Sequence, residues 1–139
     1  MAQAILVEKY VEDAQKLLSV LDKNQRDIAA LFWFYSEGHE RWRLMIASPK
    51  FDSLMTNAED YRRIYDILYD DFNEIELERL QFSDLHLKPT FELMIQALAK
   101  EYTVTTQKPV WLESFVYNGS YIDGVVILRL NLPAEAHYG

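Results

Sequence analysis

Four residues near the N-terminal third of the chain could form a surface that binds an anion or a planar ring. Residues 30–49 read ALFWFYSEGHERWRLMIASP, with aromatic residues and arginines on either side of a short polar break. If the two halves pair as antiparallel strands around an even-numbered loop, Phe34 meets Arg41 and Phe32 meets Arg43 on one face. Because a guanidinium is both a donor fork and a flat cation, this face could bind a partner.

The same pairing predicts a second, apolar face for this hairpin. Trp33 then lies opposite Trp42, and Leu31 lies opposite Leu44. We expect these four residues and Ile46 to be buried beneath a helix. A purely structural alternative exists for the first face, in which the arginines only lie over exposed phenylalanines and shield them from water.

An acidic segment, residues 58–80, contains two further arginines that bear on function. Its carboxylates could bind a divalent metal, because hard cations take several oxygen ligands. However, Asp66 lies within one helical turn of Arg62 and Arg63, where ordinary ion pairs form. We therefore expect a solvated, salt-bridged helix face with no metal site, and no cofactor elsewhere. In an alternative function, Arg41, Arg43, Arg62 and Arg63 together bind the anionic substrate of an enzyme or a small anionic ligand.

No pattern of a nucleophile with its activating base is evident in the sequence. His39, His86 and His137 are far apart and have no metal-binding spacing. Ser48 and Ser114 have no histidine placed by the sequence to activate them. The chain has no cysteine, which excludes thiolate nucleophiles and disulfides.

Three helices are predicted from apolar residues that recur every three or four positions. The first has its apolar stripe between residues 4 and 21, and the second has its stripe between 61 and 72, with Asn57 as the N-cap. The third begins after Pro89 with Thr90 as its cap, and its apolar face carries Phe91, Met94, Ile95, Leu98 and Tyr102.

Strands are predicted where branched and aromatic residues gather between turn signals. Asn118 and Gly119 tolerate the positive φ angles of a tight hairpin turn. The predicted strands are residues 28–35, 41–47, 80–87, 110–117 and 121–130. The order α-β-β-α-β-α-β-β predicts an α+β fold, with a mainly antiparallel sheet of about five strands and three helices covering one face.

Composition and charge restrict the class of protein. The chain has 139 residues, of which 50% are hydrophobic and 14% aromatic, and this suits one ordered domain over 1–139 with a loose tail from about 132. The net charge of −8 disfavours nucleic-acid binding. The start, MAQAILVEKY, lacks the basic region of a secretory signal and is too short for a membrane span. We expect a cytoplasmic protein that does not bind membranes.

The segments AALFWFY and RWRLMIASP, together with YNGSYIDGVVILRL near the C-terminus, resemble a set of short uncharacterised bacterial proteins of unknown function. The resemblance covers both predicted hairpins and the helix over 61–72. It implies a fold type and a bacterial or phage source, and it implies no catalytic residue.

The sequence favours a non-enzymatic interaction or accessory protein. We expect it to bind another protein, or its own copy, through the aromatic and arginine surface formed by Phe32, Phe34, Arg41 and Arg43. Aromatic residues and arginine are the types enriched at interfaces, and an acidic protein suits a partner with a basic patch.

Overall fold

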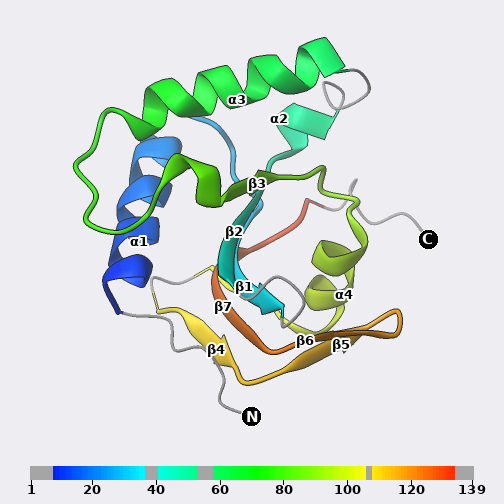
Figure 1. Ribbon diagram of the computed structural model, residues 1–139. Coiled ribbons are helices and arrows are strands. Elements are labelled where there is room, and N and C mark those ends of the chain that lie inside the picture. Colours follow the sequence, from blue (N-terminus) through cyan, green and yellow to red (C-terminus); the bar gives the residue numbers. More distant parts are fainter. Residues whose placement is uncertain (1–7, 37–40, 53–57, 106–107, 134–139) are drawn as a thin grey trace.

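A five-stranded sheet forms the centre of the protein (Figure 1). The computed structural model describes residues 8–36, 41–52, 58–105 and 108–133. The strand order is β3-β2-β1-β7-β4, and every neighbouring pair is antiparallel except β2 and β3. The strands of this sheet are β1 (Ala30–Ser36), β2 (Arg41–Ala47), β3 (Leu85–Leu87), β4 (Val110–Leu112) and β7 (Gly124–Leu130). The predicted α+β class with a mainly antiparallel sheet is confirmed.

Helices cover both faces of the sheet, and not one face as predicted. Helices α1 (Glu8–Lys23) and α3 (Ala58–Phe72) lie on one side, and α4 (Leu93–Glu101) lies on the other (Figure 1). A separate two-stranded hairpin, β5 (Phe115–Tyr117) and β6 (Ser120–Ile122), packs on the α4 side. Short turns of helix, α2 (Pro49–Asp52) and η1 (Phe82–Asp84), complete the fold. The central strands are apolar on both faces, so each face requires its own cover.

The first core lies between the sheet, α1 and α3. Trp33 is fully buried there, donates its indole N–H to the Tyr10 carbonyl at 3.3 Å, and meets the Tyr10 ring edge to face. As predicted, one sheet face packs on the apolar stripe of α1. That face carries Leu31, Trp33, Leu44 and Ile46, with Trp42 half-buried beside them.

The register of the first hairpin differs from the predicted one by two residues. Trp33 pairs with Leu44 and Phe34 pairs with Arg43, because the strands end at Ser36 and Arg41, with four residues between them. The predicted register instead placed Arg41 opposite Phe34, two residues away from its observed partner Ser36. A shift of two residues keeps the alternation, so every side chain remains on the face that was predicted for it.

The second core lies beneath α4 and the β5–β6 hairpin. Helix α4 begins at Leu93, and the carboxylate of Glu92 caps it by accepting from the Met94 and Ile95 amides at 2.7 and 3.3 Å. The prediction of Thr90 as the cap is wrong, because Thr90 is buried and donates its amide to Asp52 at 2.8 Å. The later start also leaves Phe91 exposed and off the apolar face.

The C-terminal hairpin forms around Asn118 and Gly119 as predicted, with φ angles of 46° and 78°. It bends halfway, so that β4 pairs with β7 in the main sheet while β5 and β6 form their own ladder. Gly124 lies at this bend. A Cβ atom there would stand 2.9 Å from the Trp42 ring, which explains the need for glycine.

Buried carboxylates connect the helices to distant loops. Asp13 of α1 accepts from the backbone amides of Glu78, Arg79 and Leu80, at 2.6 to 3.2 Å. Leu80 is buried, so its amide in particular would otherwise lack a partner away from water. Asp13 therefore holds the segment after α3 against α1.

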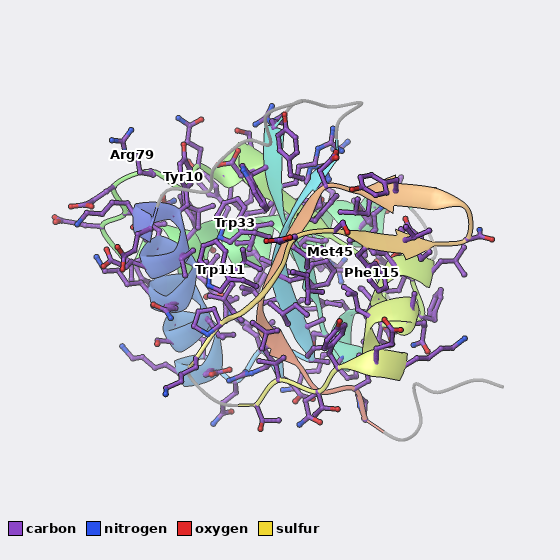
Figure 2. All side chains as sticks on the ribbon, turned by 90° about the horizontal axis from the view of Figure 1, so that it is seen from below. Tyr10, Trp33, Met45, Arg79, Trp111 and Phe115 are labelled. Atoms are coloured by element: carbon purple, nitrogen blue, oxygen red, sulfur yellow. The ribbon has the colours of Figure 1, made fainter. Side chains whose placement is uncertain are left out.

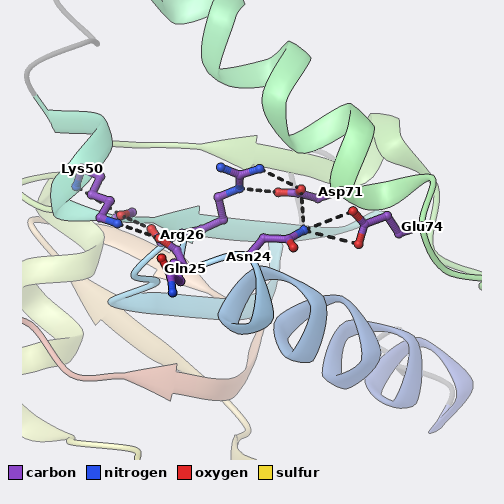
Figure 3. Close-up of polar contacts among 7 residues, drawn as sticks. Asn24, Gln25, Arg26, Lys50, Asp71 and Glu74 are labelled. Carbon is purple, nitrogen blue, oxygen red and sulfur yellow. Dashed lines mark hydrogen bonds and ion pairs between the residues drawn. The ribbon is translucent and has the colours of Figure 1, made fainter.

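A second carboxylate, Asp71, connects α3 to the turn between α1 and β1 (Figure 3). It accepts from Arg26 Nε at 2.7 Å and Nη2 at 3.0 Å, and from the Asn24 amide at 2.8 Å. The acidic helix α3 is thus anchored at its C-terminal end by Asp71, and not by the predicted ion pairs of Asp66 with Arg62 and Arg63. Among the described residues, Asp66 forms no ion pair with Arg62 or Arg63.

Candidate binding surface

The aromatic half of the predicted surface is not exposed. Phe32 is fully buried and Phe34 nearly so, within the core beneath α4 and the β5–β6 hairpin. The expected exposure of these two rings is therefore wrong. Alternation along β1 assigns them to the correct face, and α4, β5 and β6, which are distant in the sequence, cover this face.

In the cationic half of the predicted surface Arg41 is exposed and Arg43 is half-buried, and β3 adds further residues to it. Strand β3 runs parallel to β2 at the sheet margin, with His86 opposite Met45. Because side chains alternate along strands, Arg41 and Arg43 project to the same face as His86 and, one step beyond β3, Lys88. We call Arg41, Arg43, His86 and Lys88 the cationic cluster. The parallel pairing that adds the last two residues joins segments about forty residues apart, so local patterns could not predict it.

One carboxylate lies within the cationic cluster. Asp84 is buried; its Oδ1 accepts from Arg41 Nη2 at 2.9 Å, and its Oδ2 accepts from the Gln81 amide at 3.0 Å. In the part of the chain that the structure describes, Arg43 and Lys88 have no ion-pair partner. The cluster therefore keeps a net positive charge within a protein of net charge −8.

The pKa of His86 indicates that the charged groups of the cluster lie close to one another. Burial lowers the pKa of His86 below its usual 6.5, and the positive charges of Arg43, Lys88 and Arg41 lower it further. The carboxylate of Asp84 acts in the opposite direction. Three cations are thus near enough to one half-buried imidazole to disfavour its protonated, positively charged form.

The lowered pKa of His86 predicts a pH dependence of stability. As pH falls below about 7, the unfolded chain takes up the proton first, so the free energy of unfolding decreases until the folded pKa is passed. His86→Gln removes this titrating group. The free energy of unfolding should then vary less with pH between about pH 7 and pH 5. Urea denaturation across this range measures both profiles. Lys88→Gln should flatten the profile partly, and parallel profiles in all three proteins would contradict the assignment.

The four arginines of the alternative function do not come together. Arg62 and Arg63 are exposed on α3, whose Ile64 and Leu68 pack on the opposite face of the sheet from the cationic cluster. An anion clamp made of Arg41, Arg43, Arg62 and Arg63 is therefore excluded by the sheet between them.

Two neighbouring cavities, of about 280 and 450 Å³, lie at the other end of the sheet. Both are lined by Thr105 and Arg129, and the Arg129 guanidinium is held by two hydrogen bonds to Asp22, at 2.6 and 2.8 Å. No residue of the cationic cluster lines either cavity. The cluster is thus separate from these two hollows.

The remaining candidate residues are dispersed. Ser48 is buried and donates to the Arg26 carbonyl at 2.7 Å, which is a structural bond between the segment before β1 and the segment after β2. His39 and His137 lie outside the described residues. Within the described ranges, no three acidic or histidine side chains are grouped as metal ligands. The expectation of no metal site stays a prediction, as does the absence of catalysis.

The fold and this surface define an α+β domain with a cationic margin on an acidic chain. Comparison with protein-family models, curated proteins and solved structures finds no match. The resemblance to short bacterial proteins therefore stays a prediction. Among the described helices, none combines the length and apolar character needed to cross a bilayer.

Proposed function

We propose that this protein is a non-enzymatic interaction protein that binds a short acidic segment of a protein partner through its cationic cluster. The observation that carries the proposal is the convergence of Arg41, Arg43 and Lys88 around His86 on one sheet margin, where Arg41 is exposed and the other residues are half-buried. Arginine fits carboxylates with two parallel hydrogen bonds, and a sheet holds such side chains at fixed spacing.

The net negative charge of the protein restricts which acidic partners can bind the cationic cluster. A uniformly charged polyanion would meet the repulsive field of a protein with net charge −8. A short run of carboxylates between neutral residues gains the local attraction with little of that repulsion. The proposal is thus specific for an acidic stretch of protein and disfavours nucleic acid.

Removing two cations from the cluster tests the proposal. We expect Arg43→Ala with Lys88→Ala to weaken binding of a four-glutamate peptide with glycine and serine flanks about tenfold or more, the scale of a moderate interface anchor. Arg41 is left unchanged because its loss would deprive buried Asp84 of its cation. Isothermal titration calorimetry at low and moderate salt measures the change.

The matched control is Arg62→Ala with Arg63→Ala, which removes the same charge from the opposite side of the sheet. This control should bind the peptide nearly as the unmodified chain does. Equal weakening by both pairs would show a general charge effect and contradict the proposed surface. Tighter binding of a single-stranded RNA oligonucleotide than of the peptide would overturn the choice of partner.

A further inference from the structure

The two edges of the central sheet differ in how their backbone is covered. At the β3 edge, helix α3 supplies two tyrosine hydroxyls to the outward-facing backbone of Leu87. Tyr65 accepts from the Leu87 amide at 3.2 Å, and Tyr61 donates to the Leu87 carbonyl at 2.9 Å. An unpaired strand edge is a template for another strand. The tyrosines therefore seal this edge against further pairing.

The opposite edge, β4, has no such seal among the described residues. Strand β4 pairs with β7 on one side, and no described group hydrogen-bonds to its other side. Its central residue, Trp111, is 56% exposed. Figure 2 looks onto this side of the molecule, where β4 leads into the β5–β6 hairpin.

Two more apolar side chains are exposed along the same ribbon. Val116 and Tyr121 are cross-strand neighbours on the outer face of the β5–β6 hairpin, and are 60% and 55% exposed. Exposed apolar side chains that gather beside an open strand edge are typical of an interaction surface. This surface is independent of the cationic cluster, which lies at the other margin of the sheet.

We propose that a second copy of this chain pairs with β4, so that the two sheets join edge to edge. A two-fold axis perpendicular to the sheet makes β4 antiparallel to its counterpart and preserves the two faces. Paired residues must then share a face, which places Trp111 opposite the same tryptophan of the other copy and Val110 opposite Leu112. The two exposed indole rings then contact each other and become buried from water.

The charges that flank β4 suit this antiparallel arrangement. Lys108 precedes the strand and Glu113 follows it, so each lysine comes close to the glutamate of the other copy. A parallel arrangement would bring like charges together at both ends. Pro109 has no amide and limits the ladder to β4 itself. The association is consequently of moderate strength.

The sealed β3 edge explains why such an assembly stops at two copies. Once the β4 strands have paired, the joined sheet ends at a β3 strand on each side. Tyr61 and Tyr65 cover both of these ends. One open edge and one sealed edge thus specify a closed dimer and not an extended polymer.

Sedimentation equilibrium of the full chain, from low micromolar to millimolar concentration, tests the dimer. We expect a monomer–dimer equilibrium, and we expect Trp111→Lys to weaken it at least about tenfold. The matched control is Leu93→Lys on α4, where the side chain is also exposed, at 62%. A monomeric unmodified chain over the whole range, or equal weakening by both substitutions, would overturn the proposal.

A charge-swap cycle distinguishes the β4 interface from any other dimer contact. Lys108→Glu and Glu113→Lys should each weaken the dimer, because each creates like charges across the interface. The double variant should recover most of the lost affinity, since it restores opposite charges with reversed positions. Failure of this recovery, with all variants folded by circular dichroism, would rule out antiparallel β4 pairing.

Discussion

Trp33→Ala is expected to lower the free energy of unfolding by about 3 to 5 kcal/mol, the usual range for a large buried aromatic cut to alanine. Trp33 is fully buried at the centre of the first core, and its indole N–H is bonded to Tyr10. The substitution removes the ring and leaves a cavity between the sheet and α1. Urea denaturation followed by circular dichroism measures the change.

Two other tryptophans provide controls for Trp33→Ala. Trp111→Ala removes an exposed ring and should change stability by less than about 0.5 kcal/mol at concentrations where the chain is monomeric. Trp42 is half-buried, and its indole N–H is buried with no partner among the described groups. Trp42→Ala should therefore cost less than Trp33→Ala. A similar loss at all three positions would contradict the described core.

Arg26→Ala is expected to destabilise the protein by about 3 kcal/mol, the low end of the range for breaking a buried ion pair. Asp71 is 2% exposed and would lose two of its hydrogen bonds. Arg26 is itself partly exposed, so water can reach the vacated space and moderate the loss. Figure 3 shows the carboxylate between the arginine and Asn24.

A double-mutant cycle separates the pair from general effects on this turn. Arg26→Ala combined with Asp71→Ala should cost less than the sum of the single changes, because no buried charge is left alone. Lys50→Ala, which removes only an exposed bond to the Gln25 carbonyl, should have little effect. Additive losses from Arg26 and Asp71 would show that the two residues stabilise the fold separately.

Local patterns predict most elements of this fold, and the main errors arise from contacts between distant segments. The faces of the first hairpin follow from alternation, although its register does not, since registers that differ by two residues give the same alternation. From the local sequence Thr90 is a plausible helix cap. In the structure its amide donates instead to Asp52, which belongs to a separate element. These outcomes depend on the tertiary arrangement and not on any short window of sequence.

The candidate surface shows the same division between local and distant information. Arg41 and Arg43 are identifiable from the first hairpin, whereas alternation alone does not reveal the burial of Phe32 beside them. The uninterrupted apolar run of β1 is a signal that both of its faces are covered. His86 joins the cluster only through the parallel pairing of β3 with β2.

The position of β7 in the sheet determines when this chain can fold during synthesis. The central strand β1 has β2 on one side and β7 on the other, and β7 occupies Gly124–Leu130. Until the ribosome has made β7, the first hairpin lacks its second neighbour and Phe32 lacks part of its cover. The nascent chain therefore completes its sheet late, and earlier stages expose an apolar strand edge that is prone to aggregation.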